Sequence, residues 1–159
     1  MSAAIAMVHD VCGRSPVITH LFNGMPAFHH RAGGPAAAAL AAAARGEAFV
    51  EVIADGVHLA PEVVRLVFDT VGADHVVLVS DAMAATGLRD GRYTLGSVDV
   101  LVAEGVARVR GRDGEPGAIA GSTRTLADCV RWAVEVAGVA ETHALTAATH
   151  TPLRALGIR

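Results

Sequence analysis

The stretch Val76-Val77-Leu78-Val79-Ser80-Asp81-Ala82-Met83 decides the fold, because an apolar run rich in valine stops abruptly on a carboxylate. A short run of this kind predicts a strand buried on both faces, as in a parallel sheet that helices cover. Asp81 then lies at the carboxyl end of that strand, which is the edge where catalytic side chains gather in α/β folds. The structural alternative is that Asp81 caps the next segment or begins a turn.

Two further strands are predicted upstream, over residues 17–19 and 49–54, where β-branched and apolar residues dominate. Helices are predicted over residues 36–45 and 61–72, each beginning at or beside a proline and stopping near a glycine. This alternation favours βαβ connections and a parallel sheet. The three strands run into ionisable residues, namely His20, then Asp55 and His58, then Asp81. That coincidence, taken from the residues alone, indicates a functional site.

The pattern changes after Gly87. Residues 90–110 alternate polar and apolar side chains around glycines, which predicts a β-ribbon insertion over the edge of the sheet. A loop is expected over residues 112–117. Helices are expected over 126–136, with Ser122 or Thr123 as the cap, and over 143–148, with Thr142 as the cap.

Composition excludes several classes of function. The chain has 159 residues, enough for one domain but short of the ~250 typical of a complete (β/α)8 barrel. A net charge of -3 without a basic cluster argues against a nucleic-acid or membrane-surface partner. No apolar run approaches the ~20 residues of a spanning helix. Cys12 and Cys129 lack disulfide-framework or zinc spacing, which favours the reducing cytoplasm.

The ionisable residues have alternative roles. A histidine at a strand end can bind a divalent metal, and a neighbouring carboxylate can take a proton from metal-bound water. The structural alternative is that a lone histidine at a strand end is more often a hydrogen-bonded structural residue. Arg31 beside Gly33 could bind a phosphate or lie on a solvated surface. His29 and His30 are not expected to share a ligand, since neighbouring side chains on an extended backbone point to opposite sides.

Five motifs occur in a fixed order: Thr19-His20-Leu21-Phe22-Asn23-Gly24-Met25, His30-Arg31, Ala54-Asp55-Gly56-Val57-His58, Leu78-Val79-Ser80-Asp81-Ala82-Met83 and Ile119-Ala120-Gly121-Ser122. Together they resemble the N-acetylglucosamine-6-phosphate deacetylase family of the metal-dependent amidohydrolase superfamily. The resemblance covers residues 17 to about 158. It implies an α/β fold, the C-terminal part of a (β/α)8 barrel, in which the strands ending at His20, His58 and Asp81 are the sixth, seventh and eighth.

The resemblance also implies roles for residues. His20 corresponds to a metal ligand, and Asp81 to the aspartate that acts as general base and then as general acid. His58 corresponds to a substrate-binding histidine, and Arg31 to a phosphate-binding arginine supplied across a homodimer interface. The other implied substrate contacts are Asn23, Gly24, Ile119, Ala120 and Gly121. The family commonly has alanine in place of Gly24 and leucine in place of Ile119.

The implied cofactor is a divalent metal, zinc or iron. The implied reaction converts N-acetylglucosamine 6-phosphate to glucosamine 6-phosphate and acetate in amino-sugar catabolism.

The chain departs from the family in ways that bear on activity. Family members carry a glutamate and another histidine as metal ligands in earlier strands, and neither of these ligands is found in this sequence. Family members also have a small β-sandwich built from both termini, which is not found here either. Residues 1–16 match no family segment. We therefore expect one partial barrel domain over residues 1–159, without the β-sandwich. It is either a truncated deacetylase or a non-catalytic remnant that binds a sugar phosphate or a partner.

Overall fold

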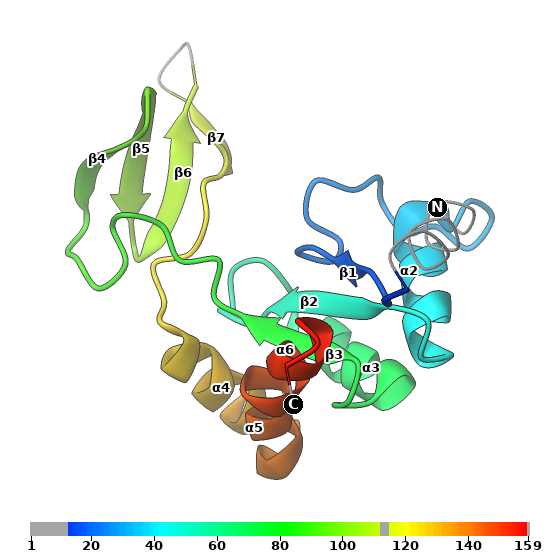
Figure 1. Cartoon of the computed structure of the whole chain (residues 1–159). Helices are drawn as coiled ribbons and strands as arrows, with labels where there is room; N and C mark the ends of the chain where they lie inside the picture. The colour runs from blue at the N-terminus through cyan, green and yellow to red at the C-terminus, as the bar shows by residue number, and fades with distance from the viewer. Residues whose placement is uncertain (1–12, 112–114, 159) are drawn as a thin grey trace.

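The computed structural model describes residues 13–111 and 115–158 (Figure 1). Its first sheet is parallel, with the strands in the order β1 (Val17–Ile18), β2 (Phe49–Ile53) and β3 (Val76–Val79). Ile18 is level with Val50, and Ile53 is level with Val79. The predicted parallel sheet is confirmed, with β1 and β2 each one residue shorter at the carboxyl end than the sequence indicated.

In the described part of the chain, five helices pack with this sheet: α2 (Gly34–Ala44), α3 (Pro61–Val71), α4 (Leu126–Glu135), α5 (Glu141–Ala148) and α6 (His150–Ala155). The valines and alanines of the strands and helices form one buried cluster, including Ala39, Val50, Val52, Val64, Val67, Val76, Ala133 and Ala144. Burying one valine side chain contributes roughly 1.5–3 kcal/mol, so this cluster is the main source of stability for the α/β part. No helix in the described ranges is long and apolar enough to cross a membrane.

The start of α4 differs from the prediction. Its cap is Thr125 rather than Ser122 or Thr123. The Thr125 hydroxyl accepts from the N–H of Asp128 at 3.2 Å, and the Asp128 carboxylate accepts from the N–H of Thr125 at 3.1 Å. Thr125 is favoured because this reciprocal pairing satisfies two backbone donors that a helix start leaves free.

The last two helices also correct the sequence-based assignment. The α5 helix begins at Glu141 after Ala140, so Thr142 lies inside it and is not its cap. The α6 helix was not predicted at all. It is fixed by the buried hydroxyl of Thr151, which donates to the carbonyl of Ala73 at 2.7 Å. That contact joins residues far apart in sequence, so no local pattern reveals it.

The second sheet is antiparallel, in the order β4 (Gly91–Leu95), β5 (Val98–Ala103), β6 (Val106–Arg110) and β7 (Pro116–Ile119). Figure 1 shows it set apart from the helices. Val100, Val102 and Ala107 are buried in a separate cluster with Met83 and Ala85. The β-ribbon is therefore present, but it extends past residue 110, because β7 pairs with β6 where part of a loop was predicted.

Candidate functional site

The ionisable residues that the sequence singled out lie at one edge of the parallel sheet. His20, Asp55 and Asp81 each follow the last residue of β1, β2 and β3 by two positions. Because the strands are parallel and in register, their carboxyl ends lie side by side. This confirms that the three strand ends gather these residues at one edge.

The turn that carries His20 is held by Glu51 in the middle of β2. One carboxylate oxygen of Glu51, Oε2, accepts from the Thr19 hydroxyl at 2.7 Å and from the His20 N–H at 3.3 Å. The carbonyl of Glu51 accepts from the N–H of Leu21 at 2.8 Å. These bonds fix a backbone with φ +32° at His20, which side-chain-bearing residues rarely adopt. Glu51 is a site residue that sequence reasoning missed.

The imidazole of His20 has an unused nitrogen. Its Nδ1 is buried and has no hydrogen-bond partner within the described residues. Buried polar atoms are normally paired, so an unpaired one indicates a missing ligand or partner group.

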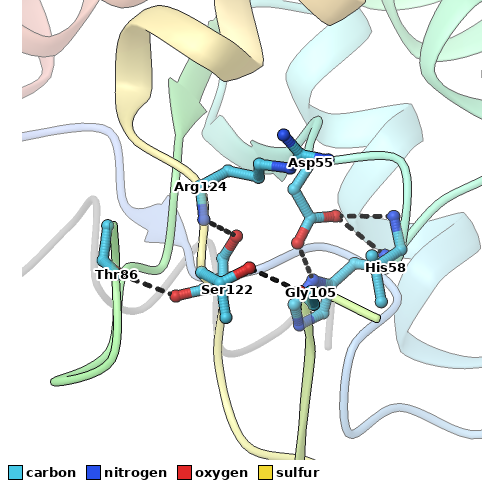
Figure 2. Close-up of polar contacts among 8 residues, drawn as sticks. Asp55, His58, Thr86, Gly105, Ser122 and Arg124 are labelled. Carbon is cyan, nitrogen blue, oxygen red and sulfur yellow. Dashed lines mark hydrogen bonds and ion pairs between the residues drawn. The ribbon is translucent and has the colours of Figure 1, made fainter. Parts of the chain in front are cut away.

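His58 and Asp55 form a buried pair (Figure 2). Oδ2 of Asp55 lies 2.8 Å from Nδ1 of His58, and each side chain is 2% exposed. Oδ1 of Asp55 accepts from the N–H groups of Val57 and His58, both at 2.9 Å. The other ring nitrogen of His58, Nε2, is buried and has no partner in the described part of the chain.

The charge on Asp55 decides which ring nitrogen of His58 carries the proton. Burial raises the pKa of the Asp55 carboxyl, but hydrogen bonds from the side chain and N–H of His58, from Val57 and from Ser122 outweigh it and lower that pKa to about 2. The ionised carboxylate therefore accepts a hydrogen bond from Nδ1–H, which favours the tautomer whose lone pair is on Nε2. Asp55 was recognised as a strand end but not as the partner of His58. The Asp-x-x-His spacing after a strand was the available signal.

The segment between β7 and α4 lies against the Asp81 turn. The N–H of Ser122 donates to the carbonyl of Asp81 at 2.7 Å, and the N–H of Met83 donates to the carbonyl of Ser122 at 2.9 Å. The Thr86 hydroxyl also donates to that carbonyl at 2.9 Å (Figure 2). A Cβ at Gly121, where φ is +96°, would lie 3.0 Å from the Asp81 carbonyl, so glycine permits this close approach. The predicted substrate contacts Ile119, Ala120 and Gly121 are therefore followed directly by a residue that bonds the backbone of Asp81.

Asp81 itself has an exposed side chain and a φ of +53°. Among the described residues its carboxylate forms no hydrogen bond, and a turn rather than a helix follows it, closed by Thr86 N–H to the Met83 carbonyl at 2.9 Å. Of the structural alternative, the helix-capping part finds no support here, whereas a turn does follow Asp81. An exposed, unpaired carboxylate at this edge is able to exchange protons with water or a bound molecule.

The loop after β1 carries the other predicted contacts. The N–H of Asn23 donates to the carbonyl of His20 at 2.8 Å, which keeps Asn23 and Gly24 beside the histidine. Arg31 is exposed, and no hydrogen bond or ion pair in the described ranges ties its guanidinium to the edge residues. The structure therefore bonds Asn23 to the backbone of His20 and shows no such bond for the Arg31 side chain among the described residues.

The rings of His29 and His30 lie close together, with centroids 4.3 Å apart, so the premise that they point to opposite sides is wrong. That the two histidines do not share a ligand stays a prediction. The backbone there is not extended, because the N–H of Ala32 donates to the carbonyl of His29 at 2.9 Å and closes a turn.

The donor set fits a metal only in part. The buried, unpaired Nδ1 of His20 suits one metal ligand. Within the described residues, however, no group of three or more histidine, cysteine, aspartate or glutamate side chains could hold an ion. A catalytic zinc centre usually needs three protein ligands, so these residues alone do not complete one.

Known proteins are similar to this chain over most of its length. No protein-family model matches. The chain is 38% identical over 141 residues to an N-acetylgalactosamine-6-phosphate deacetylase of Escherichia coli O157:H7, covering 89% of this chain and 35% of that protein. It is 38% identical over 139 residues to an Escherichia coli K12 protein that bears the same name provisionally, covering 87% of this chain and 78% of that protein.

A solved structure shares the fold. It is a variant of N-acetyl-D-glucosamine-6-phosphate deacetylase from Mycobacterium smegmatis in complex with N-acetyl-D-glucosamine-6-phosphate. The TM-score is 0.78 at 38% identity, covering 99% of this chain and 46% of that one. The chain therefore spans only about a third to a half of these longer relatives.

Proposed function

Because this chain belongs to the family of N-acetylgalactosamine- and N-acetylglucosamine-6-phosphate deacetylases, we propose that it is the carboxyl-terminal part of a deacetylase catalytic unit. The reaction hydrolyses the acetamide of an N-acetylhexosamine 6-phosphate to acetate and the free amine, as a step of amino-sugar catabolism. The observation that carries the proposal is the pair of buried, unpartnered ring nitrogens of His20 and His58 at the carboxyl edge of the sheet. In this proposal β1, β2 and β3 are the sixth, seventh and eighth strands of a (β/α)8 barrel.

His20 is the proposed metal ligand. A divalent ion, zinc or iron, would polarise the acetamide carbonyl and acidify a water molecule. The described residues supply one ligand for such an ion and not three. The remaining ligands must therefore come from elsewhere, either from residues outside the described ranges or from another polypeptide.

Asp81 is the proposed proton-transfer group. Its exposed carboxylate takes a proton as water adds to the carbonyl carbon, and returns it to the nitrogen as the C–N bond breaks, so that the amine leaves neutral. The hydrogen bond from Ser122 to the Asp81 carbonyl and the absence of a side chain at Gly121 support this role, because they fix the backbone that carries the carboxylate.

His58 and the loop residues are proposed to bind the substrate. With Asp55 holding Nδ1, Nε2 of His58 is left to face the substrate. Asn23 and Gly24 would contact the sugar phosphate, and Ile119, Ala120 and Gly121 would line the sugar pocket. The exposed Arg31 would bind phosphate across the interface of a homodimer. The cytoplasmic location expected from the sequence remains a prediction.

A second candidate function is favoured by the incomplete metal donor set. In this alternative the chain is a non-catalytic remnant that binds a sugar phosphate or a partner and hydrolyses nothing.

One experiment separates the two functions. The purified chain is assayed for amine release from N-acetylglucosamine 6-phosphate and N-acetylgalactosamine 6-phosphate, alone and mixed with the amino-terminal half of a related deacetylase. Metal content is measured in parallel, and Asp81→Asn serves as the control. Release that requires the added half and Asp81 supports the deacetylase. Binding of the amino-terminal half or of a sugar phosphate without any release supports the remnant.

A further inference from the structure

A basic pocket lies at the opposite edge of the parallel sheet from the candidate site. It measures about 490 Å³. One side is lined by residues that precede or begin the strands, namely Arg14, Ser15, Gly46, Phe49 and His75. The other side is lined by the end of α6 and the residues after it, namely Arg154, Ala155, Gly157 and Ile158. His20, Asp55 and Asp81 follow the carboxyl ends of the same strands, so the two sites do not share residues.

Arginine side chains give this pocket its positive charge. Two arginines line it, and none of its described lining residues is acidic. Asp74, beside the pocket, pairs with Arg154 at 2.8 Å and offsets that charge. Burial and the nearby Arg154 lower the pKa of His75, so Arg14 is the lining cation that no carboxylate pairs among the described residues. Guanidinium groups bind phosphate oxygens in a planar, bidentate geometry, so the chemistry favours an anion.

The two guanidinium groups are already positioned. Nη1 of Arg14 donates to the carbonyl of Leu156 at 3.3 Å, and Nη1 of Arg154 donates to Asp74 at 2.8 Å. The buried bond from Thr151 to the Ala73 carbonyl fixes α6 to the loop that carries Asp74 and His75. A ligand therefore meets side chains whose freedom is already restricted, which lowers the entropic cost of binding.

Two stacked rings contribute to the lining of the pocket. The centroids of Phe49 and His75 lie 5.2 Å apart at an interplanar angle of 23°, and Phe49 is only 7% exposed, so the half-buried His75 is the more accessible ring. Gly46 faces the edge of His75, where a Cβ would lie 3.4 Å from Nε2. An aromatic face beside fixed arginines suits a ligand that joins an anionic group to a small sugar-like or apolar body.

We propose that this basic pocket binds a small phosphate monoester, with the phosphate between Arg14 and Arg154 and the organic part against Phe49 and His75. The site is independent of the deacetylase proposal. It would let a phosphorylated metabolite bind at the far edge of the sheet from the reacting edge.

The test is a titration of the full chain followed by two-dimensional amide NMR, first with inorganic phosphate and then with glucose 6-phosphate. We expect saturable shifts for the amides of Ser15, His75 and Ala155, and tighter binding of the monoester. Arg14→Ala should weaken binding by roughly tenfold, because it removes a charge-assisted hydrogen-bond donor. The matched control is Arg89→Ala, which removes an exposed arginine shortly before β4 and should leave these shifts unchanged.

Arg154→Ala also breaks the ion pair with Asp74, so Arg154→Lys, which keeps the charge, is compared with it. Weaker binding in Arg154→Ala with partial recovery in Arg154→Lys supports the proposal. Shifts that do not saturate, or that disappear in Arg89→Ala and persist in Arg14→Ala, would overturn it. Equal affinity for inorganic phosphate and glucose 6-phosphate would overturn the assignment to a monoester.

Discussion

Oδ2 of Asp55 lies 2.8 Å from Nδ1 of His58, and both side chains are buried where β2 ends. Oδ1 of the same carboxylate accepts from the N–H groups of Val57 and His58, both at 2.9 Å. Asp55 therefore binds both the ring of His58 and the backbone of the loop that carries it, so the orientation of the histidine depends on this carboxylate.

The first prediction concerns acid stability. The folded-state pKa of Asp55 is about 2, below the ordinary value of 3.8, so its stabilisation is complete above about pH 4 and is lost as the pH falls toward 2. A shift of this size corresponds to roughly 2–3 kcal/mol. Urea unfolding of the wild type and of Asp55→Asn across this range should give stabilities that differ at pH 6 and converge at low pH. The control Asp69→Asn removes only an exposed pair with Arg65, worth about 0.2–1 kcal/mol. A difference that stays constant with pH would contradict the prediction.

Much of the sheet was predictable because its sequence signals are local. Residues 76–79 are uninterrupted aliphatics between polar groups, and the strand forms over those residues. The gathering of His20, Asp55 and Asp81 followed from parallel strand ends alone. The cap of α4 was also within reach, since only Thr125 has an acidic residue three positions later.

The missed features depend on distant partners. Glu51 is a lone charged residue within a strand, and only the pairing of β1 with β2 brings Thr19 and His20 to it. The α6 helix contains Pro152, and proline in a sequence usually indicates the end of a helix, although it is tolerated in the first helical turn. Its anchor, Thr151, bonds to the carbonyl of Ala73 near β3. Such contacts become visible only once the strands and helices are placed.

The second prediction tests the support of the His20 turn. Glu51→Ala removes the acceptor for both Thr19 and His20, whereas Thr19→Val keeps the side-chain shape and removes one donor. We expect Thr19→Val to lower the free energy of unfolding by about 0.5–1.5 kcal/mol, and Glu51→Ala to lower it further. Denaturant unfolding measures stability, and the NMR signals of the His20 ring report its orientation. Equal effects of the two variants would mean that the 3.3 Å contact to the His20 N–H contributes nothing.

The third prediction concerns metal affinity. His20 is the single predicted ligand, so the chain alone should bind divalent metal weakly and lose it on dialysis. Elemental analysis before and after dialysis measures this, and His20→Asn should abolish whatever binding remains. His143→Asn, which changes an exposed histidine of α5, is the matched control. A tightly held, stoichiometric ion in the wild type would mean that other side chains complete the centre.

The last prediction concerns Asp81 in a complex completed by the amino-terminal half of a related enzyme. Asparagine keeps the shape of the side chain but cannot accept a proton, so Asp81→Asn should lower turnover by ~10²–10⁴-fold, the range typical of losing a general base. The concentration of substrate needed for half-maximal rate should change far less. Arg31→Ala should do the reverse and raise that concentration, because it affects binding rather than the bond that breaks. Asp99→Asn, an exposed carboxylate of β5, should leave both constants unchanged. If Asp81→Asn turned over substrate as fast as the parent complex, the proton-transfer role would be wrong and Asp81 would be a turn residue.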